Sequence, residues 1–265
     1  MPIVDTHCHA SLAWFEPVES LLFQMDRNGV ERAVLIQIRN HYNNDYIFEC
    51  AQRYPDRLVP VVGVDVSRPD ATRELERLAE RGARGIRLTP MDRSPGEDPL
   101  AIWRTAERLG LPVSCLGTGA QFGSDEFPSV LEAVTNVPIV IEHLGSALEP
   151  PSAAGAEARR KVFALSRYPN AFVKVPGLGE FARRAIPVTE PFPFEQPIPP
   201  YLEWAYAAFG AERMMWGSDY PPSGGREGYQ RALQLCMAEF ARIARSDSDR
   251  DTIFGATALR VFWPA

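Results

Sequence analysis

The stretch Val4-Asp5-Thr6-His7-Cys8-His9 opens the chain and combines a buried strand pattern with two histidines. In an extended strand, successive side chains point to opposite faces, so His7 and His9 face the same side. Imidazole is a common ligand for zinc and also acts as an acid or base near neutral pH. The simpler alternative is a pair of polar side chains at a strand end. Because two of the four histidines in the chain stand at this spacing, we interpret them as a functional pair.

The composition is that of an ordinary globular protein. The chain has 265 residues, of which 45% are hydrophobic and 23% charged, and this length suits a single α/β barrel. A net charge of -6 argues against a nucleic acid or an anionic membrane as a partner. The four cysteines form no CxxC pair, and the N-terminal residues lack a signal-peptide pattern, so we expect reduced thiols and a cytoplasmic protein.

Apolar strands alternate with helical segments along the whole chain. After the first strand, we predict strands at residues 32–38, 58–65, 85–89, 112–116, 138–144, 171–175 and 214–218. Helical spacing occurs at residues 17–28, 44–54, 69–81, 100–109, 127–135, 156–168, 230–245 and 249–261. Mostly apolar strands followed by helices are typical of parallel strands that are covered on both faces. Eight such units predict a (β/α)8 TIM barrel, a single domain over residues 1–265. The alternative is a doubly wound open sheet, whose usual glycine-rich phosphate turn is absent.

The segment at about residues 176–200 departs from this alternation. It contains seven prolines, with Phe181, Phe192 and Phe194 among them, and is too irregular for a simple helix. It follows the seventh strand, at the rim where barrel active sites lie. We interpret it as an active-site loop that walls the pocket, and a rigid structural insert is the alternative.

Two further polar residues are expected at the same rim. His143 ends the sixth predicted strand, where alternation with Ile139 and Ile141 would aim it inward, and Asp219 ends the eighth. Alone, each has a simpler interpretation, as a core histidine and as a turn residue. Since the carboxyl ends of barrel strands meet at one mouth, we expect both to join the histidine pair of the first strand.

The complete pattern resembles the amidohydrolase superfamily from end to end. The motifs that carry the resemblance are His7-x-His9, Asp45-Tyr46 with Arg57-Leu58-Val59, Gly85-Ile86-Arg87, Glu142-His143-Leu144-Gly145 and Trp216-Gly217-Ser218-Asp219-Tyr220-Pro221. The chain is most similar to the amidohydrolase-2 branch, or TIM-barrel-fold hydrolases, which includes sugar lactonases and the 2-pyrone-4,6-dicarboxylate lactonase. The resemblance implies a TIM-barrel hydrolase that acts on a lactone.

The sequence also departs from the metal-dependent members of this superfamily. They generally carry a histidine ligand on strand five, where this chain has Cys115 and no histidine. Strand four carries Arg87 and no lysine, so a binuclear centre is not expected. Cys115 is either a replacement ligand or a buried apolar thiol. Glu142 stands where the branch usually has aspartate, and we expect its side chain to face away from His143.

The resemblance and the residue types suggest a hydrolytic mechanism. Asp219 is the expected general base for a water molecule, while His7, His9 and His143 orient that water and polarise the carbonyl group. They do so either directly or through one divalent ion, zinc or manganese. In the second case His7, His9 and Asp219 are the expected metal ligands, with His143 beside them. The similarity to the pyrone lactonase favours the metal-independent alternative.

Basic and aromatic residues near the rim are candidates for substrate binding. Arg87 and Lys174 lie within strands, where a buried charge needs a partner, and a substrate carboxylate is one such partner. An acidic side chain inside the barrel is the other. Arg39 and Tyr42 follow the second strand, and Trp14 follows the first.

Three functions are compatible with these features. The first is the hydrolysis of a small carboxylated lactone or related cyclic ester. The second is the metal-dependent, non-oxidative decarboxylation of an unsaturated or aromatic carboxylic acid, and the third is ligand binding without catalysis. The expected partner is a small anionic organic molecule, and assembly into a homo-oligomer is compatible with the sequence.

Overall fold

Eight parallel strands form the barrel that the sequence predicts. The computed structural model describes residues 1–145 and 153–264. Its strands are β1 (Ile3–Cys8), β2 (Val30–Ile36), β3 (Leu58–Gly63), β4 (Ile86–Leu88), β5 (Val113–Cys115), β6 (Ile139–Ile141), β7 (Ala171–Val175) and β8 (Met214–Trp216). Each strand pairs in parallel with the next one along the chain. The predicted (β/α)8 TIM barrel is therefore confirmed.

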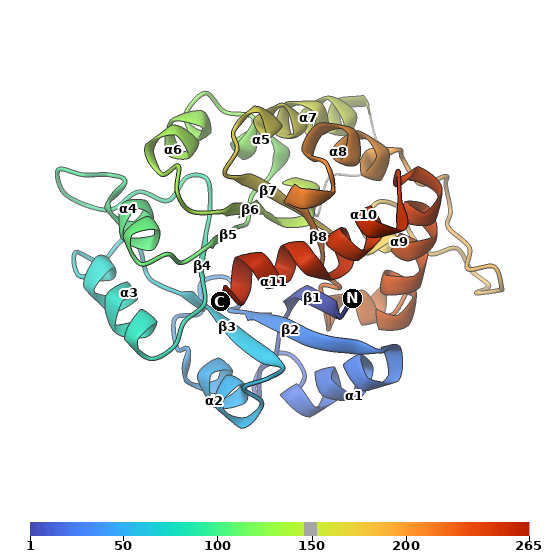
Figure 1. Cartoon of the computed structure of the whole chain (residues 1–265), viewed down its shortest axis with the longest axis horizontal. Helices are drawn as coiled ribbons and strands as arrows, with labels where there is room; N and C mark the ends of the chain where they lie inside the picture. Colours follow the sequence, from blue (N-terminus) through green and yellow to red (C-terminus); the bar gives the residue numbers. More distant parts are fainter. Residues whose placement is uncertain (146–152, 265) are drawn as a thin grey trace.

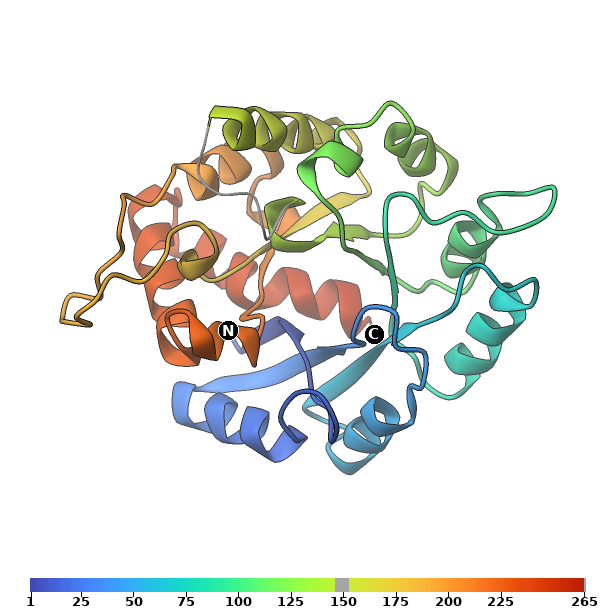
Figure 2. The same cartoon turned by 180° about the vertical axis from the view of Figure 1, so that it is seen from behind.

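Helices surround this barrel in both views of the ribbon (Figures 1 and 2). They are α1 (Val18–Asn28), α2 (Asp45–Arg53), α3 (Ala71–Glu80), α4 (Ala101–Arg108), α5 (Gly119–Phe122), α6 (Phe127–Ala133), α7 (Ala153–Phe163), α8 (Tyr201–Phe209), α9 (Tyr229–Ile243), α10 (Asp247–Asp251) and α11 (Thr257–Phe262). Short 3₁₀ turns, η1 (Glu142–Gly145) and η3 (Leu178–Glu180), follow β6 and β7. Across the described ranges, no helix is both long and apolar enough to cross a membrane.

Two hydrophobic cores hold the barrel together. The larger lies between the strands and the surrounding helices, where every second strand residue, such as Ile139 and Ile141, packs outward. The smaller lies inside the barrel, and its members are Val34, Ile36, Val59, Val61, Val140, Met215, Val261 and Phe262. The last two belong to α11, which lies on the side of the barrel where both chain termini are found (Figure 1). The apolar part of the barrel interior therefore lies at the end covered by α11, and the polar residues lie toward the opposite mouth.

β1 and β8 close the barrel without a regular ladder. A single parallel bridge joins Cys8 to Tyr220. Around it, the Thr6 hydroxyl donates to the Trp216 carbonyl (2.7 Å), and the Asp219 amide donates to the carbonyl of His7 (2.8 Å). These bonds align the ends of the first and last strands, so the residues that follow them share one mouth.

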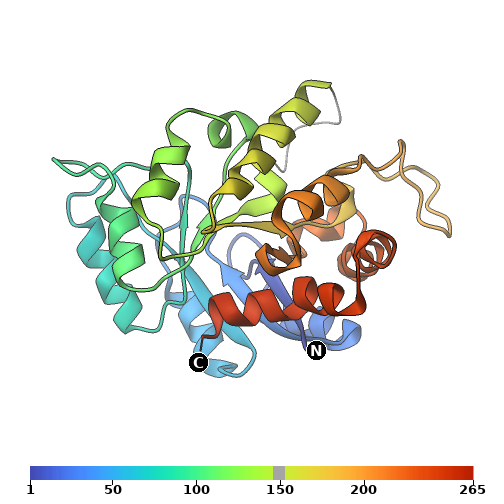
Figure 3. The ribbon, with the colours of Figure 1, turned by 45° about the horizontal axis from the view of Figure 1, so that its top comes forward.

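The proline-rich segment at residues 176–200 has two parts. η3 stays against the barrel and directs Glu180 toward the mouth. The later part bends back on itself through a bridge between Arg184 and Phe194 and projects from the side of the molecule (Figure 3). Ile186, in this projecting part, is 84% exposed. The portion nearest β7 is thus the one that reaches the predicted site.

Candidate active site

The three predicted imidazoles and the predicted carboxylate lie together at the mouth of the barrel. Nε2 of His7 and of His9 lie 3.7 and 3.6 Å from Oδ1 of Asp219. The His7 ring centroid is 5.0 Å from that of His9 and 4.6 Å from that of His143. All four side chains are buried. The expected cluster therefore exists as a geometric unit, and the catalytic roles of its members stay predictions.

His143 reaches the mouth by a route that the sequence pattern did not predict. Ile139 and Ile141 pack outward against the helices, whereas Val140 faces the barrel interior. The expectation that alternation with the two isoleucines aims His143 inward is therefore wrong. His143 and Leu144 instead adopt a left-handed backbone, both with φ 53°, which turns the chain at the end of β6. Because residues other than glycine rarely adopt this backbone conformation, the turn is locally strained.

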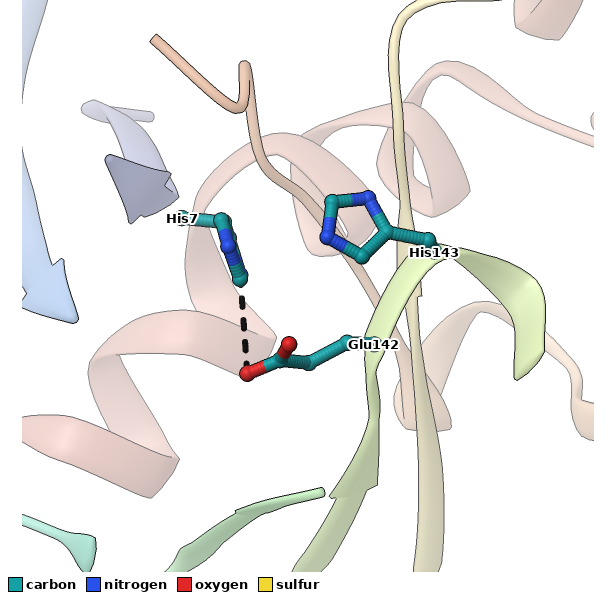
Figure 4. A group of neighbouring side chains, drawn as sticks. All are labelled: His7, Glu142 and His143. Atoms are coloured by element: carbon teal, nitrogen blue, oxygen red, sulfur yellow. Dashed lines mark ion pairs between the residues drawn. The ribbon is translucent and has the colours of Figure 1, made fainter. Parts of the chain in front are cut away.

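Glu142 corrects a second expectation, because it faces into the barrel and toward the site. Its carboxylate accepts hydrogen bonds from Arg87 (2.7 and 3.1 Å) and from the Ser114 hydroxyl (2.7 Å). It also lies 3.8 Å from Nδ1 of His7, and Figure 4 shows this pair together with His143. Burial alone would raise the pKa of Glu142, but the charges of Arg87 and Lys174 outweigh it and lower the pKa to about 2. The carboxylate is therefore a charged part of the inner wall.

The two strand-embedded cations have partners inside the barrel. Arg87 uses Nε and Nη2 for Glu142, and its Nη1 donates to the Gln37 carbonyl (3.0 Å). Lys174 lies 2.7 Å from the Ser114 hydroxyl and 3.3 Å from Nδ1 of His7. Burial lowers the pKa of Lys174 to about 8. The guanidinium fork that was expected to grip a substrate carboxylate is thus already occupied by Glu142.

A pocket of about 330 Å³ opens beside this wall, at the carboxyl ends of β2, β3 and β4. Arg39, Tyr42 and Arg87 line it, together with acidic residues such as Asp65 and Asp92. The Arg39 side chain makes no hydrogen bond or ion pair with any described residue, so it is available to a ligand. The structure therefore brings three of the five predicted substrate-binding residues to one pocket.

The other two predicted substrate-binding residues lie outside this pocket. Lys174 is buried inside the barrel, and Trp14 is 67% exposed. Trp14 stacks on Phe15, which in turn stacks on His9 with ring centroids 5.3 Å apart. Trp14 is therefore connected to the site through Phe15.

Hydrogen bonds at Nδ1 determine what two of the histidines present to the mouth. Nδ1 of His9 lies 2.7 Å from the Ile36 carbonyl, and Nδ1 of His143 lies 2.8 Å from Oε1 of Glu180. Because these oxygens accept, each Nδ1 carries a proton, and Nε2 is the nitrogen that faces the site. Burial lowers the pKa of His143, but the charge of Glu180 outweighs it, so the net shift is upward. For His7, burial and nearby positive charges lower the pKa well below its ordinary value.

Sequence reasoning missed Glu180 and Arg226. Nη2 of Arg226 lies 3.0 Å from Oδ2 of Asp219 and 3.3 Å from Oε1 of Glu180. Glu180 lies in the irregular proline-rich segment and Arg226 in a loop, and neither belongs to a recognisable motif. Only the placement of η3 beside the mouth could have pointed to Glu180.

The donor set fits a single divalent ion. Donor atoms of His7, His9 and Asp219 all lie within 4.8 Å of one another, and Nε2 of His7 is buried without a hydrogen-bond partner among the described residues. Two imidazoles and one carboxylate suit zinc. Cys115 does not complete this set, because it packs in the outer core, where burial raises the pKa of its thiol well above the ordinary value.

The parallel barrel, with imidazole and carboxylate side chains gathered at its C-terminal mouth, identifies this chain as a TIM-barrel protein. Within this class, the chain belongs to the amidohydrolase family, which it matches over residues 4–263. It is 29% identical over 249 residues to L-fucono-1,5-lactonase from Burkholderia ambifaria, covering 89% of this chain and 81% of that protein.

Two further proteins are similar to this chain. It is 24% identical over 213 residues to 4-sulfomuconolactone hydrolase from Rhizobium radiobacter, covering 78% of this chain and 67% of that protein. Among solved structures, an amidohydrolase from Burkholderia multivorans with bound zinc has a TM-score of 0.78 at 20% identity and covers 99% of both chains. The family resemblance of the sequence is therefore confirmed.

Proposed function

We propose that this protein hydrolyses a small carboxylated lactone or a related cyclic ester, with Asp219 as the base that activates water. The position of Asp219 carries the proposal, because Oδ1 faces both Nε2 atoms of the histidine pair. Burial alone would raise the pKa of Asp219, but His9, His143 and Arg226 outweigh it and lower the pKa. Asp219 is therefore ionised at neutral pH and can accept a proton.

In the proposed reaction, Asp219 takes a proton from a water molecule while the oxygen of that water attacks the carbonyl carbon of the lactone. The ring C–O bond then breaks, and the same proton passes to the leaving alkoxide, which yields a hydroxy acid. His143, whose pKa is raised by Glu180, is protonated on both ring nitrogens in this step, so that Nδ1 donates to Glu180 and Nε2 donates to the developing oxyanion. His7, His9 and Asp219 would hold a divalent ion, which when bound supplies Lewis-acid stabilisation of the oxyanion.

Two observations support the substrate class. Two curated relatives carry lactone-hydrolase names, and Arg39 at the pocket offers a guanidinium with no ion pair to any described residue. A guanidinium of this kind can bind a substrate carboxylate bidentately. Arg39 is accordingly the cation that we assign to the substrate, in place of Arg87.

The test is a panel of sugar lactones and carboxylated lactones with a pH indicator, applied to the wild type and to Asp219→Asn. We expect the wild type to release acid from at least one lactone and the variant to lose about 100- to 10,000-fold in kcat, as is typical for a general base. Asp98→Asn is the matched control, since Asp98 is partly exposed and pairs with Arg104. Full activity of Asp219→Asn would contradict the assignment, and a zinc-loaded wild type inactive on every lactone would favour the decarboxylase alternative.

A further inference from the structure

A network of charged side chains contacts both Asp219 and His143. Arg226 is at its centre, with Nη2 3.0 Å from Asp219 and 3.3 Å from Glu180. Glu180 in turn lies 2.8 Å from Nδ1 of His143. The carboxylate and the imidazole that we place in the reaction are therefore linked through one arginine and one glutamate.

Glu227 fixes this group against the backbone of η3. Its carboxylate lies 3.9 Å from Nε of Arg226. Its two oxygens would lie 2.0 and 1.9 Å from Cβ atoms added at Gly177 and Gly179, so a side chain at either position would displace the Glu227 carboxylate. The close approach joins the loop after β7 to the loop after β8. Glu180 and Arg226 thus lie on two segments that pack closely against each other.

We propose that Arg226 and Glu180 form a positioning pair that orients Asp219 and His143 for the reaction, an inference that rests on the proposed hydrolase function. Arg226 binds Oδ2 of Asp219 and so leaves Oδ1 directed at the histidine pair. Glu180 binds Nδ1 of His143 and so directs Nε2 of that ring to the mouth. Without the guanidinium, the carboxylates of Asp219 and Glu180 would repel each other and both would turn away.

The contacts favour positioning over substrate binding. The Glu180 side chain is fully buried, and that of Arg226 is 25% exposed. Nη2 of Arg226 is already shared between two carboxylates, in contrast to the unpaired side chain of Arg39 at the pocket. Arg226 therefore acts through Asp219 and Glu180, and its removal should change kcat much more than KM.

Steady-state kinetics on the lactone that the wild type hydrolyses gives the first test. We expect Arg226→Gln and Glu180→Gln each to lower kcat about 10- to 100-fold, as is typical for residues that hydrogen-bond a reacting or ligating side chain, with KM within about threefold of the wild type. Because the two residues act as a unit, the kcat of the double variant should lie within about threefold of the kcat of the less active single variant. Multiplying effects, or a raised KM with unchanged kcat, would overturn the proposal.

Chemical rescue separates positioning from a structural role. Arg226→Ala should regain at least about tenfold in kcat when guanidinium chloride is added at concentrations well below those that unfold the protein. Arg231→Ala is the matched control, because Arg231 pairs with Glu190 on the projecting segment, and it should keep wild-type kcat with and without guanidinium. No rescue in a folded Arg226→Ala protein counts against the pair.

A measurement without turnover distinguishes failure of this proposal from failure of the proposed function. Since the chain has four histidines, their ring nitrogens can be assigned by ¹⁵N NMR. At one fixed pH, Glu180→Ala should shift Nδ1 of His143 and leave exposed His41 unchanged. If the variant shows this shift but the wild type turns over no lactone, the hydrolase function alone is refuted. If Nδ1 of His143 does not shift in the variant, the positioning pair is refuted.

Discussion

At the scale of single residues, the site depends on backbone conformations that few side chains adopt. His143, Leu144 and Asp219 all have φ 53°. Aspartate and histidine adopt this left-handed conformation more readily than leucine does, so Leu144 makes the turn after β6 the more strained of the two. Strain of this kind persists only where surrounding contacts enforce it. Arg159, which donates to the carbonyls of His143 and Leu144 (both 2.8 Å), is such a contact.

The donor geometry of His9 leads to a prediction about metal affinity. Since Nδ1 is bound to the Ile36 carbonyl, only Nε2 is free to bind an ion. We expect His9→Ala to lower zinc affinity by at least about 100-fold, because loss of a ligand exceeds the 10- to 100-fold typical of outer-shell changes. Competition with a coloured chelator measures this, and exposed His41→Ala is the control. Equal zinc affinity in the two variants would remove His9 from the metal site.

The sequence predicted the members of the cluster better than their orientation. The spacing of His7 and His9 was sufficient, because a strand has a fixed period. The orientation of His143 was predicted for the wrong reason, and Glu142 was expected to face away, because a strand pattern cannot reveal where the backbone turns left-handed. Arg226 was missed because it lies in a loop without a recognisable motif, and one of its partners, Glu180, comes from a segment that is distant in sequence.

At the scale of elements, the ion pair of Arg87 with Glu142 ties β4 to the end of β6. Glu142 has a pKa of about 2, below its ordinary value of 4.5. Its stabilising effect is therefore complete above pH 4.5 and is lost as the pH falls toward 2, and a shift of this size corresponds to about 3 kcal/mol. The pair thus makes the stability of the barrel wall depend on pH in the acidic range.

We predict that Glu142→Gln removes this dependence. We would measure the free energy of unfolding of the metal-free protein in urea from pH 6 to pH 3. Over this range the wild type should lose about 2 kcal/mol more of it than the variant, which is most of the contribution of the Glu142 pKa shift. Glu212→Gln is the control, since Glu212 is 72% exposed and pairs with exposed Arg260, and its curve should parallel that of the wild type. Parallel curves for the wild type and Glu142→Gln would show that this carboxylate titrates normally.

The strands and most helices were predictable because their signals are local. Apolar runs located all eight strands, although β3, β4, β5, β6 and β8 proved shorter than expected. The helix α8 (Tyr201–Phe209) was missed because prolines crowd the residues before it. The predicted helix at residues 249–261 is divided by a π-turn at Thr252–Ala256. Such interruptions arise from packing against the barrel, which composition alone does not reveal.

At the scale of the whole molecule, the closure of the barrel and the assembly of the site are one event. His7 lies on β1, His9 directly follows it and Asp219 follows β8, so the seam between these strands brings them together. Besides the bridge between Cys8 and Tyr220, the seam has bonds to side chains, such as those that the hydroxyl and the amide of Ser218 donate to the buried Asp5 carboxylate (2.6 and 2.9 Å). A small shift along this seam would move the histidine pair relative to Asp219 while leaving the rest of the barrel intact.

Two buried threonines allow this coupling to be tested. Thr6 donates to the Trp216 carbonyl across the seam (2.7 Å), and Thr257 donates to the Ala211 carbonyl before β8 (3.2 Å). Both are fully buried, so Thr→Val at either position leaves a buried carbonyl without its partner and should cost about 1–3 kcal/mol in the free energy of unfolding. Only Thr6→Val should also lower kcat, by about tenfold or more, because small misplacements of reacting groups are costly. Chemical denaturation and lactone kinetics on both variants measure the two effects. If Thr257→Val lost as much kcat as Thr6→Val at equal folded fraction, activity would follow overall stability, and the seam would have no special connection to the site.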